Sequence, residues 1–159
     1  MIILGIDPGI GRCGWGVIEA NNAKLKALAY GCIETDPKKE VAERLSEIYF
    51  EITKIIKKNK PNALSIEELF FNTNAKTAFV VGQARGVILL SGAENKLPIA
   101  IYTPLQVKIA VTGYGRAEKE QVGKMVKTIL ALKNIPKPDD TTDALAIAVT
   151  HAFSHKMAK

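Results

Sequence analysis

The sequence predicts an α/β protein built on a mixed five-stranded sheet with helices on both faces. Three strand-like runs come first, at residues 1–7, 12–20 and 25–35, before any helical pattern. Two later strand-like runs, at 63–67 and 98–103, alternate with segments of helical periodicity. A meander followed by strand–helix alternation puts antiparallel and parallel pairs into one sheet, and the helices then cover its two faces.

The first strand is the apolar run Ile2–Ile6, which ends in the turn-forming tripeptide Asp7-Pro8-Gly9. Asn21-Asn22 supplies turn residues between the second and third strands. The three strands are therefore expected to form an antiparallel meander. The fourth strand repeats the first pattern, because the apolar run Ala63–Ile66 ends in Glu67.

Four helices are expected between and after these strands. The first has apolar residues every three or four positions and stops before Pro61. Asn72-Thr73-Asn74 can cap the second helix, which continues to about Glu94. The last two helices are predicted at residues 118–133 and 140–157.

The composition indicates one globular domain, residues 1–159, with a basic surface. The chain is 47% hydrophobic and 24% charged, with a net charge of +6 and a pI near 9.3. That charge favours an anionic partner, nucleic acid first. Cys13 and Cys32 lack metal or redox spacing, so we expect free thiols in a reducing cytoplasm. We find no secretion signal and expect no membrane association, because the most apolar stretch, residues 78–90, is too short to span a bilayer.

Four carboxylates indicate a catalytic site. Asp7 and Glu67 each end an apolar strand, and Asp140 and Asp143 are three apart, so they share one helix face. If the first and fourth strands are adjacent and parallel, Asp7 and Glu67 emerge at the same sheet edge, where the last helix can join them. Crowded carboxylates repel one another, and Mg²⁺ relieves that repulsion. In a basic protein this pattern predicts metal-dependent phosphodiester chemistry, with two ions about 3.5–4 Å apart.

A second interpretation of the first turn remains open. Asp7-Pro8-Gly9-Ile10-Gly11 also fits a sugar-kinase-like or actin-like protein, in which the hairpin cradles a nucleotide phosphate.

Neighbouring acidic residues are not expected in the site: strand alternation turns Glu68 away from Glu67, and Asp139 is expected before the helix. His151 and His155 lie well beyond the aspartates and are interpreted as ordinary helical residues.

Several motifs, in a fixed order, resemble the bacterial RuvC family of Holliday-junction resolvases. They are Gly5-Ile6-Asp7-Pro8-Gly9, Ile66-Glu67 with Phe70, Gly82-Gln83-Ala84-Arg85-Gly86, and Asp140-Thr141-Thr142-Asp143-Ala144-Leu145-Ala146. The resemblance covers nearly the whole chain, from residue 1 to about residue 151. It implies a ribonuclease-H-like fold, a homodimer, and cutting of four-way DNA junctions that depends on Mg²⁺ or Mn²⁺.

The resemblance also assigns roles to individual residues. The metal-binding and catalytic residues would be Asp7, Glu67, Asp140 and Asp143. Phe70 would work near the junction centre as an apolar wedge. Lys108 and Lys119 would lie near scissile phosphates, where a lysine stabilises negative charge.

The second helix is expected to bury two faces, one against the sheet and one against a second subunit. Small residues line one stripe of it, namely Ala75, Ala78, Gly82 and Gly86. Arg85, among apolar neighbours, is expected to make structural hydrogen bonds. Family resemblance adds cooperation with the RuvA–RuvB branch-migration complex.

These observations give one functional hypothesis and two alternatives. The hypothesis is an endonuclease that resolves Holliday junctions by paired symmetric nicks in recombination and repair. The alternatives are another ribonuclease-H-like nuclease, acting on structured RNA, and a catalytically idle module that binds junctions.

Overall fold

The three N-terminal strands form the expected antiparallel meander. The computed structural model describes residues 1–21, 24–68 and 75–157, apart from the side chains of residues 75–76 and 156–157. The strands are β1 (Ile2–Asp7), β2 (Arg12–Asn21) and β3 (Lys24–Glu34). β2 pairs antiparallel with both of the others. Residue 22 of the Asn21-Asn22 turn lies outside the described residues.

The remaining strands run parallel to β1 and complete a mixed sheet. β4 (Ala63–Glu67) pairs with β1, and β5 (Ile99–Tyr102) pairs with β4. The strand order is β3-β2-β1-β4-β5. Parallel neighbours need a crossover, and α2 (Ala75–Glu94) provides it between β4 and β5. The expected five-stranded mixed sheet is therefore confirmed.

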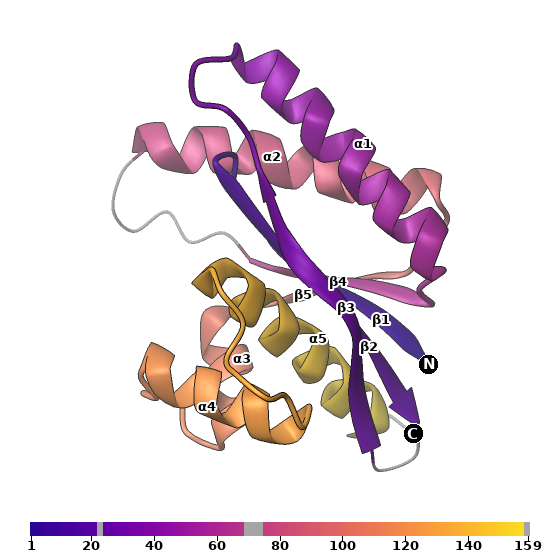
Figure 1. Cartoon of the computed structure of the whole chain (residues 1–159), viewed down its shortest axis with the longest axis vertical. Helices are drawn as coiled ribbons and strands as arrows, with labels where there is room; N and C mark the ends of the chain where they lie inside the picture. Colours follow the sequence, from indigo (N-terminus) through magenta and orange to yellow (C-terminus); the bar gives the residue numbers. More distant parts are fainter. Residues whose placement is uncertain (22–23, 69–74, 158–159) are drawn as a thin grey trace.

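Helices cover both faces of the sheet (Figure 1). α1 (Val41–Asn59) and α2 pack together on one face. On the other face lies α5 (Asp139–Met157), against which α3 (Pro104–Thr112) and α4 (Lys119–Ile129) pack. Strand alternation divides the core, because Ile3 packs with the α5 layer while Leu4 and Ile6 pack with the α1–α2 layer.

Two glycines let α5 lie unusually close to the sheet. Gly5 of β1 and Gly16 of β2 are cross-strand partners that face this helix. A Cβ atom at Gly5 would lie 2.2 Å from the backbone oxygen of Ala144, and one at Gly16 would lie 2.6 Å from the Leu145 side chain. Any side chain at either position would therefore push α5 and its first turn away from the strands.

The helix α3 was not predicted from the sequence. It begins with a capping box, in which Thr103 accepts a hydrogen bond from the Gln106 backbone N–H and the Gln106 side chain accepts one from the Thr103 N–H. Pro104 at the first helical turn suits a helix start. The helix was missed because its apolar residues do not gather on one face.

The prediction that Asp139 precedes the last helix was also wrong, since α5 begins at Asp139.

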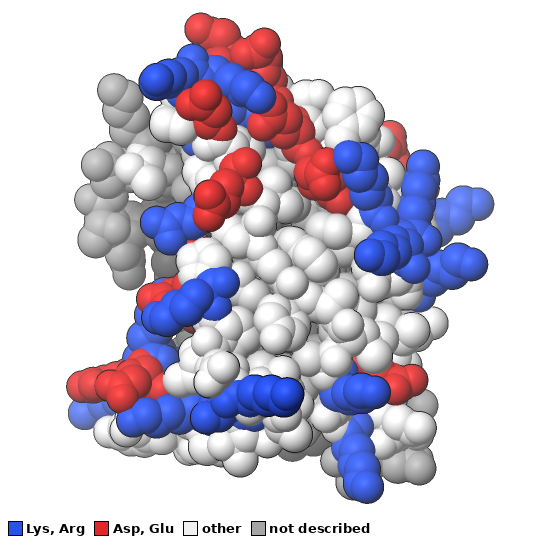
Figure 2. Space-filling model, in the orientation of Figure 1, with Lys and Arg blue, Asp and Glu red and all other residues white. Residues whose placement is uncertain are grey.

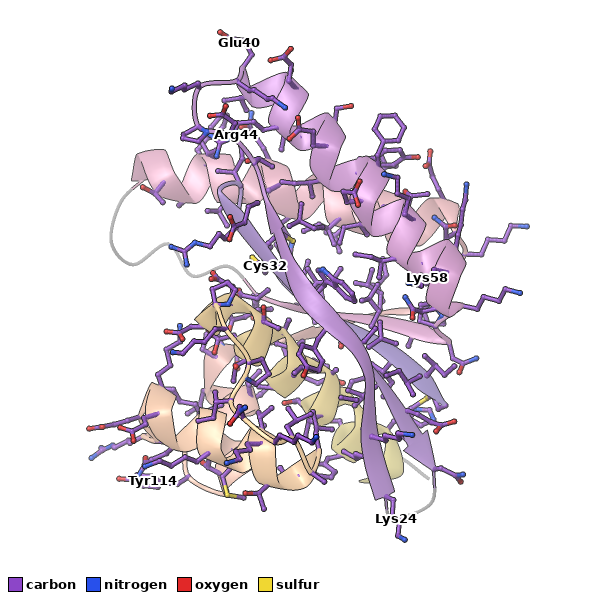
Figure 3. The ribbon with its side chains drawn as sticks, in the orientation of Figure 1. Lys24, Cys32, Glu40, Arg44, Lys58 and Tyr114 are labelled. Carbon is purple, nitrogen blue, oxygen red and sulfur yellow. The ribbon has the colours of Figure 1, made fainter. Side chains whose placement is uncertain are left out.

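Charged residues are unevenly distributed on the surface. Figure 2 shows basic side chains gathered over the carboxyl end of α1, where Lys57 and Lys58 occupy the last turn and Figure 3 labels Lys58. Cations are favoured at a helix carboxyl end by the helix dipole.

Cys13 and Cys32 are free thiols, as expected. Within the described residues, every helix is too short or too polar to cross a bilayer.

Candidate active site

Two carboxylates of the site come from the ends of neighbouring strands. Asp7 is the last residue of β1, and Glu67 is the last residue of β4. These strands are parallel, with Ile6 opposite Ile66, so both acidic residues leave the sheet at the same edge. Burial, together with the negative charge of the nearby Glu67 carboxylate and of the other acids, raises the pKa of Asp7 to about 8. The predicted juxtaposition of the two residues is thus present in the structure.

The first turn of α5 brings two further carboxylates to this edge. Gly14 of β2 lies opposite Asp7, and a Cβ atom there would be 1.9 Å from the backbone oxygen of Asp140. The bare backbone at Gly14 therefore lets α5 begin directly over the strand ends. Asp143 and Asp140 add to the repulsion that raises the Asp7 pKa. The four acidic residues form one electrostatically coupled cluster.

Burial also perturbs the acids nearest to Asp7. It raises the pKa of Glu67, and the negative charge of Asp143 adds to that shift. The pKa of Asp143 is raised by burial as well, although the ammonium group of Lys119 opposes the shift. Ionising these groups together is therefore costly in the absence of a cation. Such mutual perturbation in a concave region is typical of a functional site.

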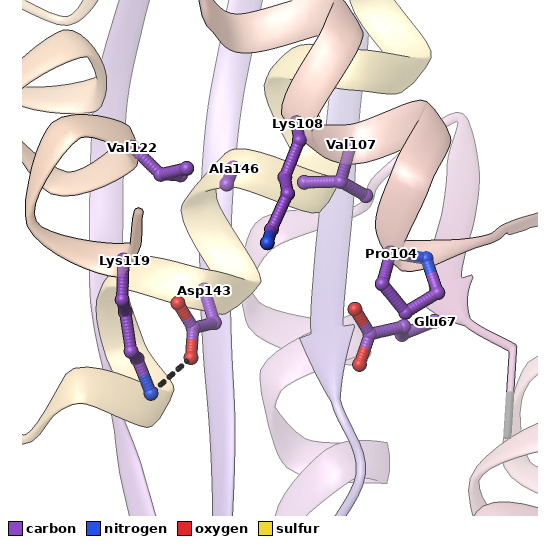
Figure 4. A pocket seen from close by; sticks show the side chains of 8 residues that line it. All are labelled: Glu67, Pro104, Val107, Lys108, Lys119, Val122, Asp143 and Ala146. Atoms are coloured by element: carbon purple, nitrogen blue, oxygen red, sulfur yellow. Dashed lines mark ion pairs between the residues drawn. The ribbon is translucent and has the colours of Figure 1, made fainter. Parts of the chain in front are cut away.

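A cation from a neighbouring element approaches each of the two α5 aspartates of the cluster, Asp140 and Asp143. Lys119 Nζ lies 2.8 Å from Asp143 Oδ2, an ion pair drawn in Figure 4. Arg12 Nη1, at the start of β2, lies 3.6 Å from Asp140 Oδ2. Sequence analysis singled out Lys119 but missed Arg12, whose position carries no distinctive signal in the sequence. Its relation to Asp140 depends on the packing of α5 against β2.

A cavity of about 250 Å³ opens beside the acidic cluster. Figure 4 shows the side chain of Lys108, from α3, directed between Glu67 and Asp143. Lys108 and Lys119 thus line the same cavity as two of the carboxylates. The full lining is Glu67, Pro104, Val107, Lys108, Lys119, Val122, Asp143 and Ala146.

The donor set fits a hard divalent cation. Carboxylate oxygens are the ligands that Mg²⁺ and Mn²⁺ prefer, and burial followed by mutual repulsion raises the pKa of Asp7, Glu67 and Asp143. Across residues 1–21, 24–68 and 75–157, no three acidic, histidine or cysteine side chains already converge tightly enough to hold an ion. Lys119 instead contacts one carboxylate directly. Cation binding would therefore require side-chain movements at this edge.

The structure also shows the surroundings of most of the other residues that the sequence singled out. Arg85 Nε donates a hydrogen bond to the backbone oxygen of Glu67 at 3.2 Å, which confirms the expected structural role. Glu68 is exposed. His151 Nδ1 hydrogen-bonds to the Tyr102 hydroxyl at 2.8 Å, consistent with an ordinary structural residue. Phe70 lies outside the described residues.

The chain is similar to known proteins over nearly its whole length. Residues 3–151 match the family model described as "Crossover junction endodeoxyribonuclease RuvC". The chain belongs to the RuvC family. A relative of that name from Desulforamulus reducens is 55% identical over 152 residues, which cover 96% of this chain and 93% of the relative.

Solved structures of the RuvC family share the fold. The Thermus thermophilus RuvC structure matches with a TM-score of 0.92 and 40% identity, covering 99% of this chain and 97% of that one. T. thermophilus RuvC in complex with a Holliday junction substrate matches at 0.91 and 37%, covering 99% and 96%. These matches confirm the ribonuclease-H-like sheet. Family membership also favours the nuclease interpretation of the first turn over the actin-like one.

Proposed function

We propose that this chain is a structure-selective endonuclease that resolves Holliday junctions by paired symmetric nicks in recombination and repair. Residues 1–159 would act as one ribonuclease-H-like nuclease domain. The observation that carries the proposal is the placement of four mutually repelling carboxylates at one sheet edge, in a chain that matches a junction-bound RuvC at a TM-score of 0.91. Two lysines in the adjoining cavity supply positive charge for a phosphate.

RuvC proteins are metal-dependent nucleases, and the acidic cluster offers the ligands. We assign metal binding to Asp7, Glu67, Asp140 and Asp143, with two Mg²⁺ ions for each site and Mn²⁺ as a substitute. Such ions supply an activated water and stabilise the leaving 3′ oxygen. The protein's part is to hold the four carboxylates together despite their repulsion. Arg85 supports this arrangement by fixing the backbone of Glu67.

The lysines position the DNA strand and balance its charge. Lys108 is directed between Glu67 and Asp143, so its ammonium group is placed to contact a phosphate that approaches the carboxylates (Figure 4). Lys119 contacts Asp143 in the free protein and can turn toward the same phosphate, because its side chain is 62% exposed. Preorganised cations in a cavity stabilise the charge that develops on a phosphate during cleavage. By family resemblance, Phe70 would wedge into the junction.

Cleavage of defined substrates tests this function and its alternatives. Purified protein is incubated with labelled four-way DNA, linear duplex and structured RNA, each with Mg²⁺ or EDTA. We expect symmetric nicks in the four-way DNA only, and only with Mg²⁺. Asp7→Asn should bind the junction without cutting it, whereas Glu68→Gln, which removes an exposed carboxylate nearby, should cut normally. RNA cleavage would favour the other nuclease, and binding without any cleavage would favour the idle module.

We also propose a homodimer that places two such sites on one junction. Two symmetric nicks require two sites related by a two-fold axis, and the interface must then be self-complementary. α2 offers an apolar surface for it: Phe79 and Leu90 are 68% and 53% exposed, and a Cβ atom at Gly86 would lie within 4 Å of no other atom of the described residues. Phe50 of α1, which is 58% exposed, extends the same surface.

Gly86→Glu tests the dimer interface. The space around a Cβ atom here lets the described part of the isolated subunit accept a longer side chain, but its charge would have to be buried on association. We expect a folded monomer by sedimentation, and nicked circles in place of linear product from a cruciform plasmid. Thr128→Glu adds the same charge to an exposed site on α4 and should stay dimeric. If Gly86→Glu also stays dimeric and linearises the plasmid, α2 is not the interface.

Cooperation with the RuvA–RuvB complex and a cytoplasmic location complete the proposal, and both rest on family membership. Adding purified RuvA and RuvB to the junction assay should change the rate or the position of cutting. Unchanged cleavage in their presence would argue against a functional interaction.

A further inference from the structure

Arg12 makes a single weak ion pair in the free protein. Its guanidinium lies 3.6 Å from Asp140 Oδ2, and its side chain is 59% exposed. It has no second acidic partner within ion-pair distance among the described residues. An exposed pair at this distance contributes little to folding stability, so exchanging it for another anion costs little. The guanidinium also has five N–H donors in a planar fork that suits a phosphate.

The position of Arg12 is fixed relative to the acidic cluster. In the β1–β2 ladder Asp7 pairs with Gly14, and Arg12 is two residues beyond that pair, past the end of β1 and on the same strand face as Gly14. The sheet order puts β2 on one side of β1, while β4 and β5 lie on the other. Lys108 follows β5 on α3, so Arg12 and Lys108 lie on opposite sides of Asp7.

The backbone that carries Arg12 is held rigidly. The close turn at Gly9 leaves only 2.1 Å between a Cβ atom built there and the backbone oxygen of Arg12. The Thr35 N–H donates to the Gly11 backbone oxygen at 3.1 Å, and Arg44 Nε donates to the Thr35 hydroxyl at 2.8 Å. An exposed charged side chain on a backbone held by these contacts is well suited to a defined phosphate contact.

We propose that Arg12 is a DNA-backbone contact of this nuclease. On binding, its guanidinium would leave Asp140 and donate to a phosphate next to the scissile one, on the side of the cluster opposite Lys108. The exchange would leave both Asp140 carboxylate oxygens free for a cation. This inference rests on the proposed function and deepens it, because it adds a second cationic side to the path of the cleaved strand.

The DNA-binding test compares Arg12→Ala, Arg12→Lys and the control Lys26→Ala. Lys26 is an exposed cation on β3 at the opposite end of the sheet, so its removal corrects for lost net charge. Junction affinity is measured in Ca²⁺ from 50 to 200 mM salt, with gels showing uncut strands. Junction affinity falls as salt rises. With one phosphate contact fewer, the fall in affinity between 50 and 200 mM salt should be about 3.5-fold smaller for Arg12→Ala than for wild type. Arg12→Lys should retain the wild-type sensitivity but bind more weakly.

A second measurement follows cation binding without DNA. Mn²⁺ titration detected by electron paramagnetic resonance should show tighter binding to Arg12→Ala than to wild type, because Asp140 no longer has a competing cation. Lys26→Ala should behave as wild type.

Two outcomes would overturn the inference: an Arg12→Ala salt dependence equal to that of Lys26→Ala, or Mn²⁺ affinity for Arg12→Ala no higher than that of wild type. Wild-type cleavage of the same junction in Mg²⁺ reports separately on the proposed function. If wild type cuts and Arg12→Ala is unchanged, only the Arg12 assignment fails.

Discussion

Asp7→Asn is expected to make the metal-free protein more stable and less sensitive to pH. The ordinary pKa of this carboxyl group is 3.8, and burial together with the surrounding acids raises it to about 8 in the folded chain. The unfolded chain therefore loses this proton at a lower pH than the folded chain does. Asparagine keeps nearly the same shape and carries no proton to lose, so it removes the penalty.

The size of the effect follows from linkage between proton binding and folding. Between pH 3.8 and about 8 the folded chain holds more protons than the unfolded chain, so stability falls as pH rises through this window. Each pH unit costs about 1.4 kcal/mol. Asp7→Asn should therefore add about 4 kcal/mol at pH 7 and about 1.6 kcal/mol at pH 5. The gain should level off above about pH 8.

Thermal melts in EDTA from pH 5 to 9 provide the measurement. A gain of about 4 kcal/mol corresponds to an increase of roughly 10 °C in Tm for a domain of this size. The control Glu68→Gln removes an exposed carboxylate one residue from the cluster and should change stability by less than about 0.5 kcal/mol. Adding Mg²⁺ should stabilise wild type by linkage and stabilise Asp7→Asn less.

Two results would refute this reasoning. If Asp7→Asn melts below wild type at pH 7 in EDTA, the ionised carboxylate is stabilised by hydrogen bonds within the protein and is not strained. If wild type and variant lose stability in parallel from pH 5 to 8, the pH dependence originates at other groups. Either result would show that burial and charge repulsion at Asp7 do not create the demand for a cation.

Three other substitutions test the site from different sides. Lys119→Ala should lower the single-turnover rate by about 10²-fold or more and change junction affinity by less than about threefold. The control Lys124→Ala should leave both the rate and the affinity unchanged. If Lys119→Ala weakens junction binding but leaves the rate at saturating protein unchanged, Lys119 is not a catalytic residue. Gly14→Ala should lower stability by about 1–3 kcal/mol and abolish cleavage, because the added Cβ would meet the backbone of α5 at 1.9 Å; calorimetry with a cleavage assay checks both. Arg85→Ala should cost about 1–3 kcal/mol by leaving the Glu67 backbone oxygen without its hydrogen-bond partner, and an unchanged melting curve would show that this bond is dispensable.

The sequence alone determined the sheet and the two acidic residues at its edge. Apolar runs such as Ile2–Ile6 form strands for local reasons, and a carboxylate that directly follows such a run must emerge at the strand end. The spacing of Asp140 and Asp143 likewise placed them on one helix face without any tertiary information. The order of these motifs was sufficient to indicate the RuvC family.

Only the tertiary structure decided how the cluster is balanced by cations. The ion pairs of Arg12 with Asp140 and of Lys119 with Asp143 join residues far apart in the chain, and both depend on where the first turn of α5 lies. That position is set by the bare backbone of Gly14 and by the packing of whole helices, so no local pattern encodes it. Electrostatic interactions depend on distance and burial, and both quantities exist only once the chain has folded.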